Sequence, residues 1–251
     1  MSIPLQFLSE MDMCEVEVHG VKVTVSVADD AALIDKKITE LRSLMRQRPV
    51  MGLDIKKADK SDRASMLLLC AGSHCLIIPN LQTLFFYYPN DSNVSGLGKL
   101  FADRTICFVG IGMNKKKYLH PSLGAMMSNA GVEVGHLAAR VLQKRDLETR
   151  KVHELAAEVG IDDIKPQSEV LSLLSPADAK DFSEKRYEFA SKLSEMGCNG
   201  RPNAPRTSMV FCPADSRVFS KREIKCAIHD VYASYLIANK LLGMVIEKRM
   251  S

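Results

Sequence analysis

The sequence predicts a mixed α/β fold in one domain that spans residues 1–251. Short apolar runs typical of strands come first, strands and helices then alternate, and helical patterns occupy the last part. Of the 251 residues, 46% are hydrophobic and 25% are charged, which is ordinary for a globular protein that buries a core.

The chain begins with a predicted hairpin and helix, residues 14–46, that we expect to be part of this domain. Valines alternate with polar residues over 14–27, and His19-Gly20 supplies a turn, as in an antiparallel hairpin with one buried face. Asp29 or Asp30 can then cap a helix. The apolar positions of that helix recur at helical spacing: Leu33, Ile34, Ile38, Leu41 and Met45.

The next segments predict the centre of the sheet. The apolar run 50–56 follows Pro49 and carries Asp54 near its end, and runs at 66–70 and 75–78 flank a turn at Gly72. These runs predict a three-stranded antiparallel meander. Further strands are predicted at 105–111 and near 132–134. An aspartate at the end of a strand commonly forms a turn or caps a helix, so Asp54 needs partners to form a site.

Helical patterns and a long loop complete the prediction. A helix with two disfavouring glycines is expected at 94–102, and the last helix begins at a Ser-x-x-Glu capping box, residues 220–223. The other expected elements are helices at 136–143, 148–159 and 177–196 and an irregular loop at 197–217.

Composition and charge narrow the class of protein. The net charge of +4 is mildly basic and compatible with polyanion binding. No apolar stretch approaches the roughly 18 residues that a membrane span needs, and residues 1–4 do not resemble a secretory signal. Seven scattered cysteines fit reduced, buried thiols. We therefore expect a nuclear or cytoplasmic protein that is neither secreted nor attached to a membrane.

Three segments together resemble a known family. They are GLDIK at 52–56, FVGIGM at 108–113 and IHDVYASYLI at 228–237. They look like the three motifs of the DEDD superfamily of 3′-5′ exonucleases, in the subgroup similar to the Werner-syndrome exonuclease domain and its plant relatives. The resemblance covers roughly residues 14–248, and it implies an RNase H-like fold and removal of nucleotides with the help of two divalent metal ions.

The chemistry of that family explains its pattern. Two divalent ions about 3.5–4 Å apart stabilise the attacking and leaving oxygens of a phosphodiester. Four carboxylates hold the two ions, Mg²⁺ or Mn²⁺, and a tyrosine or histidine beside them orients or deprotonates the water.

This sequence departs from the family pattern at the positions that matter most. The resemblance places catalytic carboxylates at Asp54 and Asp230, which are both present. The glutamate expected two residues after Asp54 is Lys56, and the aspartate expected after the second glycine is Lys116. The tyrosine expected four residues before Asp230 is Cys226.

These substitutions predict a site without metal. The two aspartates and the two lysines sum to zero charge, and an ammonium group cannot ligate a cation and repels one. We hypothesise that Lys56 and Lys116 replace the metals by pairing with Asp54 and Asp230. No metal and no cofactor are therefore expected.

Without catalysis, nucleic-acid binding is the first functional hypothesis. A single-stranded nucleic acid would contact the basic residues around the former active-site cleft. These are Lys56, Lys57, Lys115, Lys116, Lys117, Lys221 and Arg222. The alternative is that they are ordinary solvated lysines and arginines on polar faces.

Two other hypotheses remain. The protein could be an interaction module, as a homodimer or as the partner of an active exonuclease, through the apolar run 84–88 and the loop 197–217. It could also retain hydrolase activity with recruited ligands such as Glu133, Asp103 or His229. His229 adjoins Asp230 and would point about 100° away from it on a helix, as a surface or supporting group.

Overall fold

The computed structural model describes residues 2–4, 13–18, 20–28, 30–45, 48–57, 65–79, 96–113, 131–166, 169 and 218–250. Four predicted segments lie outside these residues: the apolar run 84–88, the lysines at 115–117, the helix at 177–196 and the loop at 197–217.

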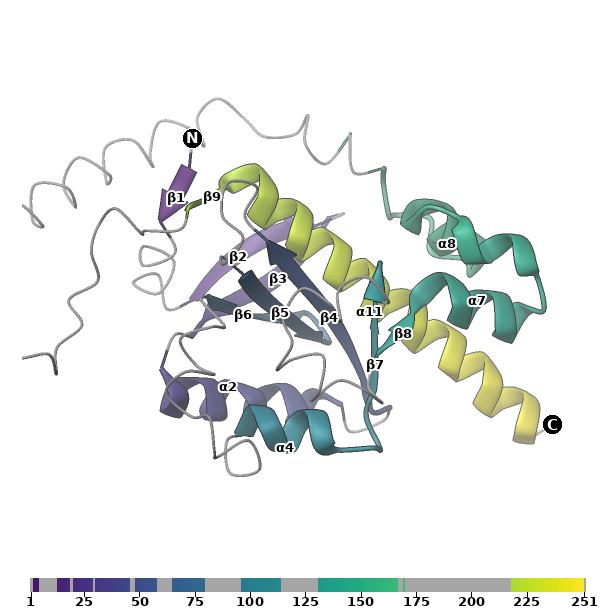
Figure 1. Ribbon diagram of the computed structural model, residues 1–251. Coiled ribbons are helices and arrows are strands. Elements are labelled where there is room, and N and C mark those ends of the chain that lie inside the picture. Colours follow the sequence, from purple (N-terminus) through teal and green to yellow (C-terminus); the bar gives the residue numbers. More distant parts are fainter. Residues whose placement is uncertain are drawn as a thin grey trace, which may run out of the picture.

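A seven-stranded mixed sheet forms the centre of the protein (Figure 1). Its strand order is β2-β3-β6-β5-β4-β7-β8. The strands are β2 (Met13–Val18), β3 (Val21–Val27), β4 (Val50–Lys57), β5 (Ser65–Ala71), β6 (His74–Pro79), β7 (Cys107–Gly110) and β8 (Val132–Glu133).

Five of these strands have the RNase H-like arrangement. β4, β5 and β6 form the predicted antiparallel meander, with Gly52 opposite Cys70 and Cys70 opposite Cys75. β7 then pairs in parallel with β4, and β8 pairs in parallel with β7. The predicted fold class, a mixed α/β sheet with an antiparallel meander and flanking helices, is confirmed.

The predicted N-terminal hairpin is also present and widens the sheet. β2 and β3 pair antiparallel around Gly20, whose φ of 76° suits a glycine at the turn. β3 lies parallel to β6, with Val25 opposite Cys75. The hairpin thereby joins the outer strand of the meander, a pairing that its own alternation could not predict.

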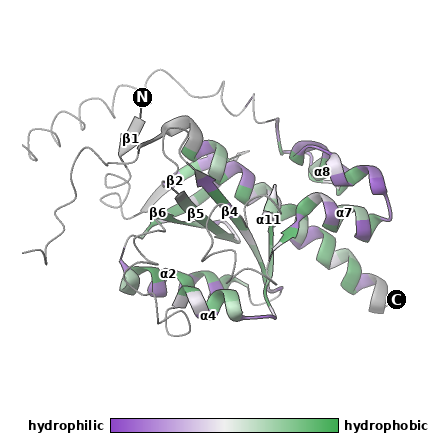
Figure 2. Cartoon of the chain, in the orientation of Figure 1, coloured by the Kyte–Doolittle hydropathy of each residue, from purple (hydrophilic) through white to green (hydrophobic). Residues whose placement is uncertain are grey.

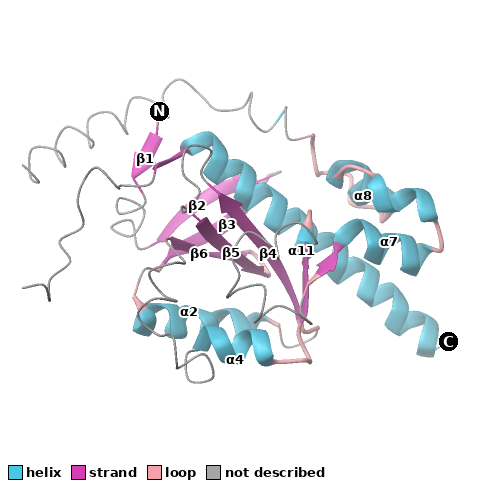
Figure 3. Cartoon of the chain, in the orientation of Figure 1, coloured by secondary structure: helices cyan, strands magenta, loops and turns pink. Residues whose placement is uncertain are grey.

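Helices cover both faces of the sheet (Figure 3). On one face α2 (Ala31–Leu44) and α4 (Gly96–Ala102) pack on Met51, Leu53 and Ile55. On the other face α11 (Lys221–Met250) packs on the sheet beside α7 (Val134–Leu142) and α8 (Val152–Glu158). Figure 2 shows mostly hydrophobic residues on the central strands and both kinds of residue on the covering helices.

One predicted helix differs from the structure at its start, and another forms as predicted despite its glycines. The expected helix at 148–159 is confirmed in its larger part by α8, but its first two residues belong to a separate 3-10 helix, η1 (Arg145–Thr149). Gly135 lets η1 approach α7 closely, since a Cβ there would lie 2.7 Å from the carbonyl oxygen of Glu148. At the start of α4 the Gly96 amide donates to the Asp35 Oδ1 atom at 2.9 Å, and a Cβ on Gly96 would lie 2.3 Å from that oxygen.

A separate two-stranded pair was not predicted. β1 (Ser2–Pro4) runs antiparallel to β9 (Val218–Ser220), which leads directly into α11. Both strands are three residues long, too short for alternation to be visible in the sequence. None of the helices in the described ranges is long and apolar enough to cross a membrane.

Candidate functional site

The two aspartates that the sequence singled out lie on facing elements. Asp54 is on β4 and Asp230 is on α11. Successive residues of a strand point to opposite faces, and Met51, Leu53 and Ile55 point toward α2 and α4. Gly52, Asp54 and Lys56 therefore face α11, and the absence of a side chain at Gly52 lets the helix approach.

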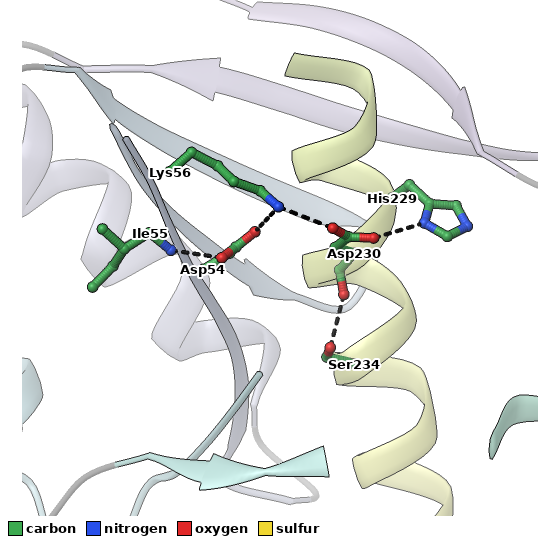
Figure 4. A network of polar contacts seen from close by, with 6 residues as sticks. All are labelled: Asp54, Ile55, Lys56, His229, Asp230 and Ser234. Carbon is green, nitrogen blue, oxygen red and sulfur yellow. Dashed lines mark hydrogen bonds and ion pairs between the residues drawn. The ribbon is translucent and has the colours of Figure 1, made fainter. Parts of the chain in front are cut away.

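Lys56 joins the two aspartates (Figure 4). Its Nζ atom lies 3.0 Å from Oδ2 of Asp54 and 3.0 Å from Oδ2 of Asp230. The side chain of Asp54 is 2% exposed, that of Asp230 is 15% exposed and that of Lys56 is 29% exposed. Of the two lysines that were hypothesised to pair with the aspartates, Lys56 pairs with both of them, whereas Lys116 lies outside the described residues. We call Asp54, Lys56 and Asp230 the ion triad.

Burial and charge act in opposite directions on the ion triad. Burial by itself would lower the pKa of Lys56, but the two carboxylates raise it well above the ordinary value of 10.5. Burial would likewise raise the pKa of Asp230, but the hydrogen bond from His229 and the charge of Lys56 lower it below 3.8. Lys56 and Asp230 are thus held in their charged forms.

A backbone amide supports the Asp54 carboxylate, and a buried hydroxyl bonds to the backbone of Asp230. The Ile55 amide donates to Oδ1 of Asp54 at 2.7 Å, and the Ser234 hydroxyl donates to the carbonyl oxygen of Asp230 at 2.8 Å. Ser234 is fully buried and lies one helical turn after Asp230. Ser234 was not singled out from the sequence, although a serine four residues after a helical residue can bond back to its carbonyl.

His229 contacts the ion triad, and the expectation that it could be a surface group is wrong. The residue is 2% exposed, with Nδ1 at 3.2 Å from Oδ1 of Asp230 and Nε2 at 3.3 Å from the carbonyl oxygen of Lys165. The helical rotation separates the directions of the two side chains, but the imidazole ring reaches back to its neighbour. His229 supports Asp230, as the second half of that expectation stated.

Glu133 is engaged elsewhere. Its Oε1 accepts a hydrogen bond from the Gly112 amide at 2.9 Å, and its Oε2 accepts one from the Met113 amide at 2.8 Å. Both oxygens therefore hold the glycine-rich turn after β7. Glu133 therefore has a structural role in this turn, and each of its oxygens keeps a further lone pair.

Asp103 lies at the wrong end of β7 for a recruited ligand. It precedes the strand, whose first residue Cys107 is opposite Val50, the first residue of β4. Its Oδ1 accepts hydrogen bonds from the Thr105 amide and hydroxyl, and its Oδ2 pairs with Arg42 at 3.1 Å. Asp54 is four residues further along β4, toward the other end of the sheet.

The described residues do not fit a divalent metal. Nowhere in the described ranges do three or more histidine, cysteine, aspartate or glutamate side chains form a group that could hold one. The two carboxylates that face each other share an ammonium group, which carries no lone pair for a metal and repels a cation. Cys226, at the position of the family's tyrosine, is a partly buried thiol on α11.

The basic residues proposed to contact nucleic acid are only partly placed. β4 ends at Lys57, and α11 begins with Lys221 and Arg222, but the side chains of these three residues are not among those described. The lysines at 115–117 lie outside the described ranges. Lys56 is the member of the set whose side chain is described, and its ammonium is bound by two carboxylates.

The fold and the strand order define an RNase H-like α/β domain. No protein-family model and no curated protein matches the sequence. Among solved structures, the EXD2 exonuclease domain soaked in Mg is similar over 90% of this chain and 92% of its own, with 17% identity and a TM-score of 0.40. A mutant of the catalytic core of RRP6 from Trypanosoma brucei is similar over 90% of this chain and 48% of its own, with 10% identity and a TM-score of 0.47. These likenesses are distant, and the fold assignment rests on the strand order itself.

Proposed function

We propose that this protein is a non-hydrolytic exonuclease-like domain that binds single-stranded nucleic acid. The observation that carries the proposal is the bridging of Asp54 and Asp230 by Lys56, at 3.0 Å from each. Hydrolysis of a phosphodiester by two metal ions needs carboxylates that are available to those ions. A lysine between the two remaining carboxylates opposes both the ligation and the approach of a cation.

Nucleic-acid binding is supported by the placement of basic residues in the chain. Lys57 ends the strand that carries Asp54, and Lys221 and Arg222 begin the helix that carries Asp230. Lysines 115–117 follow the turn that Glu133 holds. Since Lys56 is shared by two carboxylates, we expect the other basic residues to supply the contacts to phosphate.

A nuclease assay tests the first half of the proposal. Single-stranded RNA and DNA labelled at the 5′ end would be incubated with the protein in Mg²⁺, in Mn²⁺ and in EDTA. We expect no shortening from the 3′ end beyond that seen in EDTA. Shortening that depends on Mn²⁺ and disappears in Asp230→Asn would overturn the proposal and favour an active hydrolase.

A binding assay tests the second half. Fluorescence anisotropy with single strands would be measured at about 50 and 200 mM salt, where each lost phosphate contact flattens the slope of log affinity against log salt by about 0.7. The variant neutralises lysines 115–117 to glutamine. The matched control neutralises three exposed lysines on α2, α4 and α11, namely Lys36, Lys99 and Lys240. We expect weaker binding and a flatter slope in the variant but not in the control.

The interaction-module hypothesis stays a prediction, because the run 84–88 and the loop 197–217 lie outside the described residues. Light scattering during size-exclusion chromatography measures the mass of the assembly directly. A stable dimer, with no binding to either nucleic acid, would favour the interaction module over the nucleic-acid binder.

A further inference from the structure

We infer that Lys56 is a built-in cation for this fold, and that it gives the Asp54–Asp230 pair the charge neutralisation that a bound divalent ion would otherwise supply. The inference deepens the proposed function, because it concerns the same site and rests on the same misfit to metal. It concerns folding, however, and it does not require that the protein bind nucleic acid.

The geometry is that of a bridging cation. One Nζ atom lies 3.0 Å from a carboxylate oxygen on the sheet and 3.0 Å from a carboxylate oxygen on the helix (Figure 4). A metal ion between two protein elements also joins oxygens from both, at shorter distances of about 2.0–2.6 Å. Lys56 therefore links β4 to α11 through charge, in addition to the apolar packing of the same two elements.

The surroundings make this cation necessary. Asp54 is buried, and its side chain is 2% exposed, so water can do little to screen its charge. Asp230 is held in its charged form beside it, with His229 bonded to its other oxygen. Without the ammonium group, two carboxylates would face each other between the sheet and the helix, and like charges in such a place repel strongly.

The position of Lys56 in the sequence fixes where the charge lies. Lys56 is two residues from Asp54 on β4, so both side chains leave the same face of the strand. The strand is held on both sides, by β5 and by β7. The Lys56 ammonium therefore reaches Asp230 by rotation about its own side-chain bonds. Asp54, its partner on β4, is held on the same face of the strand.

Thermal unfolding of the full chain in EDTA, in millimolar Mg²⁺ and in millimolar Mn²⁺ tests the inference. We expect the unfolding temperature of the wild type to be the same in all three. In EDTA, Lys56→Met should unfold roughly 5–10 °C lower, because it leaves a buried charge without its partner. Divalent ions should restore part of that loss, by screening or binding between the two aspartates. The control Lys36→Met, at an exposed lysine of α2, should behave as the wild type.

Each outcome decides the matter. A wild-type unfolding temperature that rises by several degrees in Mg²⁺ or Mn²⁺ would overturn the inference, as would a folded Lys56→Met whose stability equals that of the wild type in EDTA. The double variant Lys56→Met with Asp230→Asn should lose the response to ions, and a response that persists counts against the inference. If Lys56→Met does not fold, Lys56→Arg decides: it keeps a cation, and it should fold and ignore divalent ions.

These results are separable from the proposed function. No nucleic acid is present in the unfolding experiment, so a failure to bind RNA or DNA leaves its outcome unchanged. Conversely, a wild type that is stabilised by divalent ions would refute the inference about Lys56. The nucleic-acid binding assay could still succeed in that case.

Discussion

Gly52 of β4 and Val231 of α11 lie in direct backbone contact: a Cβ atom on Gly52 would be 2.4 Å from the Val231 carbonyl oxygen. Real side chains do not approach a carbonyl so closely. The contact therefore requires glycine at this position, and it sets the distance between the strand and the helix one residue away from Asp230. The ion triad is assembled by that close approach.

Gly52→Ala should accordingly push the helix away from the strand. We expect a loss of about 2–3 kcal/mol in the free energy of unfolding, because neither backbone can move without disturbing the buried core around it. Urea denaturation measures this loss. The control Gly20→Ala has open space around it and a positive φ, and it should cost about 1 kcal/mol from backbone strain alone. Equal losses in the two variants would contradict the steric role of Gly52.

The acid stability of the protein should depend on Asp230. The pKa of its carboxyl is lower in the folded state than the ordinary 3.8, mainly because His229 and Lys56 outweigh the effect of burial. Its ionised form therefore stabilises the fold above about pH 4, and this stabilisation is lost as the pH falls through the lowered value. Asp230→Asn should be less stable than the wild type at neutral pH. Its stability should also fall less steeply in acid, as measured by urea denaturation from neutral pH downward.

The stabilising contribution of Lys56 has the opposite pH dependence to that of Asp230, and it is lost at alkaline pH. Despite burial, the two aspartates raise its pKa above the ordinary 10.5, so its charged form stabilises the fold fully below about pH 10. That contribution is lost only as the pH rises through the elevated value. The difference in stability between the wild type and Lys56→Met should therefore stay constant from about pH 6 to pH 10. A difference that vanishes within this range would mean that the ammonium loses its proton too early to bridge the pair.

Glu133 is predicted to stabilise the glycine-rich turn. Glu133→Gln keeps the shape of the side chain but removes its charge and turns one acceptor into a donor that faces a backbone amide. We expect a loss of about 1–2 kcal/mol and faster amide exchange at Gly112 and Met113. Glu148→Gln, at a half-exposed glutamate beside His136, should change stability by less than about 0.5 kcal/mol. A neutral effect of Glu133→Gln would show that the turn holds its shape without this side chain.

His229 offers a matched comparison with another histidine. His229→Ala should cost about 2 kcal/mol, because it opens a buried space and removes one hydrogen-bond partner each of Asp230 and of the Lys165 carbonyl. His136, whose side chain is 47% exposed, provides the control, and His136→Ala should be close to neutral. Similar unfolding midpoints for the two variants would argue against a supporting role for His229.

Local patterns predicted most of the sheet, because each strand carries its own signal. The alternating valines of 14–27, the apolar runs of the meander and the turn at Gly72 correspond to β2, β3, β4, β5 and β6. The pairing of β3 with β6 could not be predicted from such patterns. It is parallel and joins segments about fifty residues apart, and neither strand's sequence indicates its partner. η1 was likewise missed because its form depends on its contact with α7.

The site was predicted only in part, because its residues come from distant segments of the chain. Asp54, Lys56 and Asp230 could be singled out from the sequence, but one of them lies 174 residues from another, and only the packing of α11 on β4 brings them together. The roles of Ser234 and Glu133 depend on backbone groups, and a backbone amide or carbonyl has no sequence signature. The burial of His229 depends on the segment that contains Lys165, which has no recognisable pattern of its own.

A metal ion exchanges with its surroundings, and the fraction of protein that carries it depends on the free concentration of the ion and on competing chelators. The ammonium group of Lys56 is joined to the chain by covalent bonds, so every copy of the protein carries it from synthesis onward. On the inference that Lys56 takes the place of a divalent ion, nothing has to be acquired before this part of the fold can close, and a magnesium chelator should not destabilise it. The domain would keep the same electrostatic balance in any cellular compartment near neutral pH, however poor that compartment is in divalent ions.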